Sequence, residues 1–338
     1  MRKVKIAEVA ARAGVSRATV DRVLNRRGGV STGKERAVFL SARALGIDRN
    51  LEAMPVKQLR VCVLMTSPEN PFYARLARGF REASLLFAEQ AITAYISYIN
   101  VLSPASINRK LRQTASNYDA LVIVAPANGQ ILDTLTAIAQ RIPVVTLATD
   151  LPLNAPHHYV GPSNYQAGRL AGEIMGRLLG RGGHVLLVAG LNDFSGHQER
   201  RSGFYAALRE DYPACAVAAE IDSFDRGASV ATAVTAALKG GKIRGIYNIS
   251  QGNDEITRRI QESGITKNFV FICHDLTPTT RELLLARHVD VVIDQDPLLE
   301  ARRAMELVLS HYGRLDAGVT DGRTPVRVVF RENATVAS

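Results

Sequence analysis

Two arginines lie five residues apart in the stretch GVSRATVDRVLN, which covers residues 14–25. An arginine side chain can donate two hydrogen bonds to the O6 and N7 atoms of guanine, and an alanine can contact the methyl group of thymine. The side chains of Arg17 and Arg22 therefore have chemistry that suits contact with a nucleic acid.

Asp21 stands between these arginines, although a carboxylate repels the phosphates of DNA. Three roles are open to it: orienting Arg17 across one helical turn, accepting a hydrogen bond from a cytosine amino group, or discouraging binding to incorrect sites. A direct phosphate contact is not expected, because an ionised carboxylate has no proton to donate. The spacing of four residues favours the pairing of Asp21 with Arg17.

The residues that would position this surface have the period of two short helices joined by a tight turn. Gly14 suits the left-handed residue that ends the first helix, and Ser16 suits the N-cap of the second. A third helix is predicted over residues 32–45. The apolar positions of the first two helices are Ile6, Val9, Ala10, Ala13, Val20, Val23 and Leu24. This pattern predicts a small all-α helix-turn-helix domain, whose second helix enters the major groove of DNA.

The excess positive charge of the chain is concentrated in the same N-terminal part. The formal net charge of the 338 residues is +10, and residues 1–60 alone contain 14 Lys and Arg but only 5 Asp and Glu. A basic N-terminal domain on a nearly neutral remainder predicts a polyanion-binding module joined to a part that binds something else. Phosphate contacts, which position a protein without reading sequence, are predicted for Arg26, Arg27, Lys34 and Arg36.

Composition and motifs argue against several other classes of protein. No apolar run approaches the roughly 18 to 20 residues of a membrane span. The charged N-terminal stretch is not typical of a secretory signal, so a cytoplasmic protein that does not bind membranes is expected. Cys62, Cys215 and Cys273 have no metal-ligand spacing and are expected to be buried free thiols.

An enzyme would need a constellation of catalytic residues that the sequence does not offer. Walker A, GxGxxG and GxSxG motifs are absent, and His157 and His158 lack a third ligand at metal spacing. No pair of carboxylates is placed for acid and base catalysis. We therefore expect no catalytic residue, no metal and no cofactor.

From residue 59 onward, short apolar runs rich in β-formers alternate with helical patterns at 71–89, 164–180, 197–211 and 297–312. Such alternation predicts an α/β fold with parallel sheets covered on both faces. The runs form two series of about five strands, which predicts two similar lobes. A ligand would then bind at the carboxyl ends of the strands, in the cleft between the lobes.

The segment IAEVAARAGVSRATVDRVLN, followed by Val30-Ser31 and a third helix ending in ALGI, resembles the LacI/GalR family of bacterial repressors. The resemblance implies that Arg17, Ala18 and Arg22 read bases. The full set of DNA contacts it implies is Ser16, Arg17, Ala18, Thr19, Asp21, Arg22, Arg26 and Arg27.

The remainder resembles the two-lobed, type I periplasmic sugar-binding fold that this family uses as its sensor. The motifs are NPFY at 70–73, YVGPSNYQAGRLAG, HQERRSGF, GNDE, HDLTP and DQDP, in that order. The implied domains are 1–47 for DNA binding, a linker at 48–59 and a ligand-binding domain at 60–338. Its lobes are expected at 60–161 with 296–325, and at 162–295 with 326–338. The linker has Asn50 and Ala53 of the family's hinge helix, but Pro55 is expected to shorten that helix or abolish it.

Carried over residue by residue, the resemblance implies a cleft lined by Asn70, Phe72, Tyr73, Asp150, His197, Gln198, Phe224, Asn253, Asp275 and Gln295. Aromatic faces can pack on the C–H side of a sugar ring, and Asn, Asp and Gln can pair with its hydroxyls. Two positions depart from the family pattern. The family's Asp comes slightly earlier than Asp150, where this chain has Ala148, and Gln198 stands where many sugar binders have Arg, with His197 and Arg200 as neighbours that could compensate.

These features predict a ligand-responsive transcriptional regulator, most simply a repressor, that binds a double-stranded DNA operator as a homodimer. A sugar or related polyhydroxylated molecule is the expected effector. A solute-binding receptor and an architectural DNA-binding protein with a degenerate sensor are the alternatives, and stabilisation by a sugar would separate the last from the others.

Overall fold

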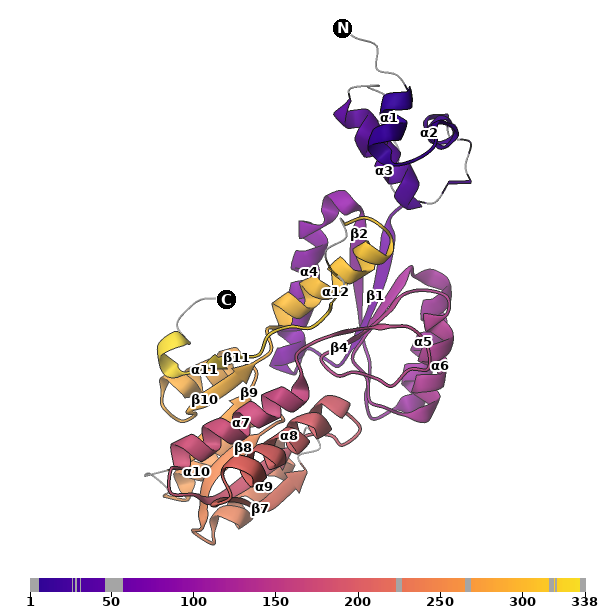
Figure 1. The fold of residues 1–338 in the computed structure, drawn as a ribbon. Coiled ribbons are helices and arrows are strands. Elements are labelled where there is room, and N and C mark those ends of the chain that lie inside the picture. The colour runs from indigo at the N-terminus through magenta and orange to yellow at the C-terminus, as the bar shows by residue number, and fades with distance from the viewer. Residues whose placement is uncertain are drawn as a thin grey trace.

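The computed structural model describes residues 6–25, 27, 29–30, 32–45, 57–222, 227–264, 269–315, 319 and 321–334. Within them, a small helical domain is followed by two α/β lobes that lie one beyond the other (Figure 1). The predicted hinge residues Asn50, Ala53 and Pro55 lie outside the described residues. No helix in the described part of the chain is both long and apolar enough to cross a bilayer.

The N-terminal domain contains three helices: α1 (Ile6–Ala13), α2 (Arg17–Leu24) and α3 (Thr32–Ala44). Gly14 has a positive φ of 63°, which a residue without Cβ adopts at no steric cost, and ends α1. The hydroxyl of Ser16 accepts a hydrogen bond from the Thr19 N–H at 3.1 Å and caps α2. Val9, Ala10, Val20, Val23, Val38 and Ala42 form the core. The predicted helix-turn-helix is confirmed.

The first lobe, lobe N, is built on a parallel sheet with the strand order β2-β1-β3-β4-β5. Its strands are β1 (Leu59–Met65), β2 (Ile92–Tyr98), β3 (Ala120–Ile123), β4 (Val144–Leu147) and β5 (His158–Val160). Its helices are α4 (Pro71–Leu86), η2 (Ala88–Gln90), α5 (Pro104–Asn117), α6 (Gly129–Ala139) and, from late in the chain, α12 (Pro297–His311). One apolar core contains residues of α4 and α12, and a second contains residues of α5 and α6, so both faces of the sheet are covered.

The second lobe, lobe C, has the strand order β11-β10-β9-β8-β6-β7. Its strands are β6 (Gly183–Ala189), β7 (Cys215–Asp222), β8 (Ile243–Asn248), β9 (Val270–His274), β10 (Val291–Asp294) and β11 (Arg327–Val329). Its helices are α7 (Asn164–Leu179), α8 (Ser195–Asp211), α9 (Gly227–Leu238), α10 (Asn253–Glu262), α11 (Pro278–Leu285) and η3 (Arg331–Asn333). The predicted two-lobed fold with parallel sheets is confirmed, although β11 is antiparallel and was not among the predicted strands.

The chain passes between the lobes at three neighbouring places (Figure 1): after β5, between β10 and α12, and before β11. Gly161 at the first passage forms a bridge with Arg323 at the third. Helix α7 begins just after the first passage and packs closely on α8, so that α8 also lies beside the passages between the lobes. A Cβ on Gly168 would lie 2.0 Å from the carbonyl oxygen of Arg200, so only glycine permits the approach that places Arg200 at the cleft.

Candidate ligand-binding cleft and DNA-binding surface

The outer face of α2 presents the predicted base-reading side chains to solvent. Arg17, Ala18 and Arg22 are exposed, whereas Val20 and Val23 on the opposite face are buried. The hydroxyl of Ser16 caps the helix and lies 2.9 Å from that of Thr19. Arg17, Ala18 and Arg22 are therefore accessible on the surface of the domain, and their contacts with bases stay predictions. Arg26 lies outside the described residues.

Asp21 does not pair with Arg17 as the spacing suggested. Within the described residues its carboxylate accepts a hydrogen bond from Asn25 Nδ2 at 2.7 Å and one from Arg27 Nη1 at 3.1 Å. The chain turns back after α2, since the Arg27 N–H donates to the carbonyl of Arg22 at 2.9 Å, and this turn brings Arg27 beside the last turn of the helix. Asp21 therefore holds Asn25 and Arg27 at the end of α2, and Arg17 remains exposed.

A cavity of about 260 Å³ lies between the lobes, at the carboxyl ends of the strands. The structure brings seven of the ten predicted ligand residues to its wall: Asn70, Phe72, Tyr73, His197, Asn253, Asp275 and Gln295. Phe224 lies outside the described residues. The agreement in position has a simple cause, because parallel strands end at one edge of each sheet.

The wall from lobe N is largely apolar and aromatic. Asn70 caps α4, with its side-chain oxygen accepting from the Phe72 N–H at 2.9 Å, and this cap fixes the start of the helix at the cavity. Phe72 packs edge-on against Tyr73, with ring centroids 5.1 Å apart. Val124 and Ala148 complete the apolar surface. Such a wall suits the C–H face of a small ring.

The wall from lobe C is a connected hydrogen-bond network. Arg200 Nε donates to Asn164 Oδ1 at 2.7 Å, and Arg200 Nη2 donates to Gln295 Oε1 at 3.1 Å. Gln295 in turn donates from Nε2 to a carboxylate oxygen of Asp275 at 2.8 Å. Arg200, Asn164 and Gln295 are almost completely buried. Arg200 can only donate hydrogen bonds, and an ionised Asp275 can only accept them. The two neighbours therefore fix which way the Gln295 amide points, and Gln295 in turn holds the Asp275 carboxylate at the cavity.

Burial also changes the protonation of two groups on this wall. Desolvation raises the pKa of Asp275 to about 6; the charge of Asp294 acts in the same direction, and that of Arg200 opposes it. Desolvation, reinforced by Arg200, lowers the pKa of His274 well below its ordinary value. The neutral His274 ring lies 2.7 Å from the Tyr247 hydroxyl. Around neutral pH this part of the wall therefore carries a largely ionised Asp275 carboxylate and a neutral His274 ring beside the buried guanidinium of Arg200.

The structure corrects the predicted positions of Asp150 and Gln198, which do not line the cavity. Ala148 has a left-handed φ of 59°, so Thr149 reaches the cavity and Asp150 lies behind it. There Asp150 accepts from the Thr146 hydroxyl at 2.7 Å. Successive residues on a helix are rotated by about 100°, and on α8 it is His197 that faces the cavity while Gln198 donates to the carbonyl of Asn192.

Several lining residues were not predicted. They are the hydroxyl residues Thr149, Ser250, Thr277, Thr279 and Thr280, together with Phe194, Gln251, Asp254 and His274; Arg200, which the sequence offered only as a neighbour that could compensate for Gln198, also lines the cavity. Two of them could have been predicted from the motif HDLTPTT, because its Thr277 and Thr280 have the spacing of a capping box and form one at the start of α11. The described residues contain no group of three His, Cys, Asp or Glu arranged to hold a metal ion.

Fold and site together define a two-lobed binding protein that carries a helix-turn-helix domain at its N-terminal side. Residues 61–314 match the periplasmic binding protein domain family, and residues 5–46 match the lacI family of bacterial regulatory proteins. The chain thus belongs to the periplasmic binding protein domain family, and its N-terminal domain is a LacI-family DNA-binding domain.

A curated relative, the HTH-type transcriptional regulator MalR of Streptomyces coelicolor, is 34% identical over 79 residues. That stretch makes up 23% of this chain and 23% of the relative, so the similarity spans less than a quarter of that protein.

Solved structures resemble the fold of the two lobes. A solute-binding protein of Burkholderia graminis in complex with D-arabinose is 21% identical, with a TM-score of 0.77 over 85% of this chain and 100% of that one. A solute-binding protein of Actinobacillus succinogenes with bound D-allose is 17% identical, with a TM-score of 0.74 over 82% and 99%. GanP, a glucose-galactose binding protein of Geobacillus stearothermophilus, is 19% identical, with a TM-score of 0.74 over 82% and 99%.

Proposed function

We propose that this protein is a cytoplasmic transcriptional regulator, acting as a repressor, whose affinity for a DNA operator is set by a sugar in the cleft between its lobes. One observation carries the proposal: a single chain joins an exposed recognition face on α2 to a cavity with one aromatic and one hydrogen-bonding wall. Neither a solute receptor nor an architectural DNA-binding protein needs both features.

On the DNA side, Arg17, Ala18 and Arg22 contact base edges, and Arg27 contacts a phosphate. Two copies of the chain present two recognition helices to the halves of a pseudo-palindromic operator. Since phosphate contacts release counterions, operator affinity falls steeply with salt. Replacing Arg22 with alanine costs roughly 1–3 kcal/mol and relaxes the preference at one base pair.

On the ligand side, the cavity suits a neutral monosaccharide. Phe72 covers the C–H face of the ring, while Asp275 and Asn253 pair with its hydroxyls and Arg200 donates to a ring or hydroxyl oxygen. A site of this kind rejects analogues that lack the hydroxyls, because its buried polar groups would be left unpaired. D-Arabinose and D-allose, bound by proteins of the same fold, are natural first candidates.

Binding of the sugar in the cleft changes the relative position of the lobes and thereby the spacing of the two DNA-binding domains. The resulting coupling between sugar and operator is typically about 1–3 kcal/mol.

Two measurements on the full-length protein test the proposal. The first is a thermal-shift panel of aldopentoses, aldohexoses and polyols, in which at least one compound should raise Tm. The second is fluorescence anisotropy with a selected operator and with random DNA of equal length, with and without that compound. Stabilisation by a sugar without preference for any DNA sequence would support a solute receptor. Sequence-specific DNA binding without any stabilising sugar would refute the proposed effector.

A further inference from the structure

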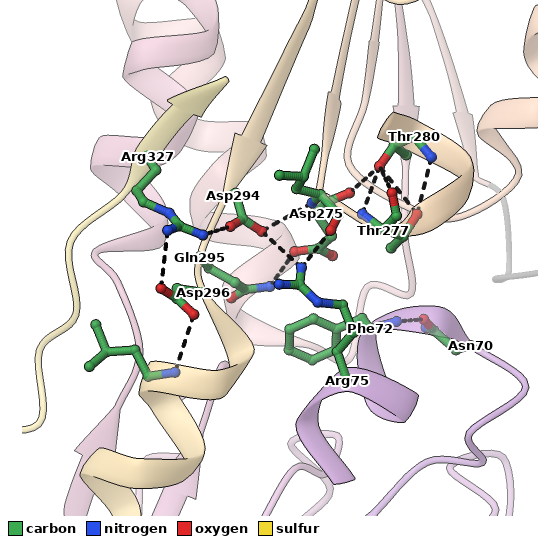
Figure 2. Close-up of polar contacts among 12 residues, drawn as sticks. Asn70, Phe72, Arg75, Asp275, Thr277, Thr280, Asp294, Gln295, Asp296 and Arg327 are labelled. Carbon is green, nitrogen blue, oxygen red and sulfur yellow. Dashed lines mark hydrogen bonds and ion pairs between the residues drawn. The ribbon is translucent and has the colours of Figure 1, made fainter. Parts of the chain in front are cut away.

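Arg75 of lobe N reaches across the cleft to lobe C. From α4, Arg75 Nη1 donates to the carbonyl oxygen of Leu276 at 2.5 Å and lies 3.7 Å from a carboxylate oxygen of Asp294 (Figure 2). The Arg75 side chain is 15% exposed and that of Asp294 is fully buried. Phe72, which lines the cavity, lies one turn earlier on the same helix. The contact is therefore a link between the lobes directly beside the ligand site.

The link holds the turn that carries Asp275. The Leu276 N–H donates to Asp294 Oδ1 at 3.0 Å, so both polar groups of the Leu276 backbone are held by the Arg75–Asp294 pair. Asp275 itself has a left-handed φ of 66°, a conformation that is uncommon for residues with a side chain and that Asp tolerates better than most. The carbonyl of Asp275 accepts from the Thr280 hydroxyl at 2.6 Å, which fixes the turn from the lobe C side.

Asp294 is in turn held by residues outside lobe N. Arg327 on β11 donates to Asp294 Oδ2 at 2.5 Å and lies 3.3 Å from Asp296, which precedes α12 at the passage between the lobes. Figure 2 shows Arg75 and Arg327 approaching Asp294 from opposite sides. A guanidinium suits both positions, because it donates in several fixed directions where an ammonium acts as a point charge.

We propose that Arg75 is a positioning residue of the ligand site, which closes lobe N onto lobe C and at the same time fixes the turn that aims Asp275 into the cavity. Ligand contact and lobe closure are then one event, since Asp275 reaches its working geometry only when Arg75 is in place. The part of this inference that concerns a ligand rests on the proposed function. The part that concerns the turn does not.

Arg75 also acts on the pKa of Asp275, which gives a second way to test its role. The charged and titratable groups that interact with Asp275 are Arg75 on α4, Arg200 on α8, Asp294 on β10 and Glu300 on α12, with the Cys273 thiol and the neutral His274 ring just before it on β9. The positive charge of Arg75 lowers the pKa of Asp275. Removing that charge therefore moves the titration of Asp275 to higher pH, which a loss of packing alone does not do.

The first experiment needs no ligand. Amide hydrogen exchange is followed in the full-length protein at residues 275–277 for wild type, Arg75→Gln and the control Arg78→Gln. Arg78 lies on the same helix, is exposed and pairs with Glu82 at 2.6 Å. Exchange in this segment should rise about tenfold or more in Arg75→Gln, because the turn opens more often, and stay at the wild-type rate in Arg78→Gln. Equal rates in all three proteins overturn the proposal.

The second experiment uses the sugar that stabilises wild type most in the panel. Arg75→Gln should raise its Kd about tenfold or more, as expected for the loss of a hydrogen bond from a charged group, and should shift the pH midpoint of binding upward. Arg75→Lys keeps the charge, so it should keep the midpoint and lose only part of the affinity. If Arg75→Gln does not fold, Arg75→Lys takes over the hydrogen-exchange experiment, where a smaller rise is expected and the wild-type rate overturns the proposal. A loss of affinity with an unchanged midpoint in Arg75→Gln overturns the positioning role. If no sugar in the panel stabilises wild type, the proposed effector class fails while hydrogen exchange still decides the role of Arg75.

Discussion

The two walls of the cleft differ in the kind of interaction they offer. The lining residues of lobe N carry no charge and include Phe72, Tyr73 and Val124, whereas lobe C contributes Arg200, Asp275 and most of the hydroxyl and amide groups. Contact with an apolar wall depends on shape and area, while a hydrogen-bonded wall discriminates by direction. Under the proposed function, this difference predicts that lobe C selects the ligand and that lobe N covers it when the lobes close.

The division is also visible in how each wall is held. Phe72 is held by the Asn70 cap at the start of α4 and by packing in the core of lobe N. Arg200, Gln295 and Asp275 are anchored by each other, so a change at one of them reaches the others. Substitutions on the lobe C wall should therefore have the larger effects, on stability as well as on binding.

The largest effect is expected for Arg200→Met. The substitution leaves Asn164 Oδ1 and Gln295 Oε1 buried without their donor, at a cost of about 2–4 kcal/mol in the free energy of unfolding. Sugar binding should be lost as well. The matched control is Arg201→Met, which removes a half-exposed arginine paired with Glu220 and should cost no more than about 1 kcal/mol. Urea denaturation measures both, and equal costs would break the distinction between the walls.

The second effect concerns the protonation of Asp275. A carboxylate can accept two hydroxyl hydrogen bonds, and it loses part of this capacity when protonated. With the pKa of Asp275 raised to about 6, affinity for a neutral sugar should be low at acidic pH, rise through pH 6 and level off above it. His274 does not contribute, because its depressed pKa keeps it neutral over this range. Below the pKa the loss approaches about tenfold per pH unit if only the ionised form binds.

Asp275→Asn removes the titrating carboxyl group, so it tests whether the pH dependence of binding comes from Asp275. The variant should bind weakly at neutral pH, and its affinity should be independent of pH between about 5 and 8. Isothermal titration calorimetry at several pH values gives both results. A pH profile that persists in Asp275→Asn would assign the titration to a different group.

Much of the fold and part of the site could be predicted from the sequence because both follow from local patterns. Alternating strands and helices dictate parallel sheets, and residues in the turn between a strand and the next helix, such as Asn70 and Asp275, lie at the cleft edge. Asp150 shows where local reasoning ends, since one left-handed residue, Ala148, decides which side chain enters the cavity. Arg200 shows a second limit: the sequence could name it as a neighbour of Gln198 but could not predict its burial, because a charged residue in a polar helix is normally exposed. The close packing of α7 on α8 that Gly168 permits accompanies this burial.

The contact between Arg75 and Leu276 shows a third limit, because the two residues are 201 positions apart in the chain. Asp21 shows the same at short range. The i, i+4 rule predicted Arg17 as its partner, but the turn after α2 supplies Arg27 and Asn25 instead. A periodicity rule describes a helix in isolation and does not include the loop that folds back on it.

Among substitutions of lining residues, Phe72→Leu on the lobe N wall is expected to change the affinity for the sugar least. Leucine keeps most of the apolar volume and loses the flat ring, so affinity for the sugar should fall by about 0.5–1.5 kcal/mol, the usual worth of an aromatic contact beyond its area. The loss should be independent of pH, since neither side chain titrates. Gln198→Ala is the control. Gln198 follows the lining residue His197 in the chain but does not itself line the cavity, so its replacement should leave the affinity unchanged. If Phe72→Leu weakened binding as much as Asp275→Asn at pH 7, lobe N would select the ligand as strongly as lobe C. The two walls would then differ in chemistry without differing in role.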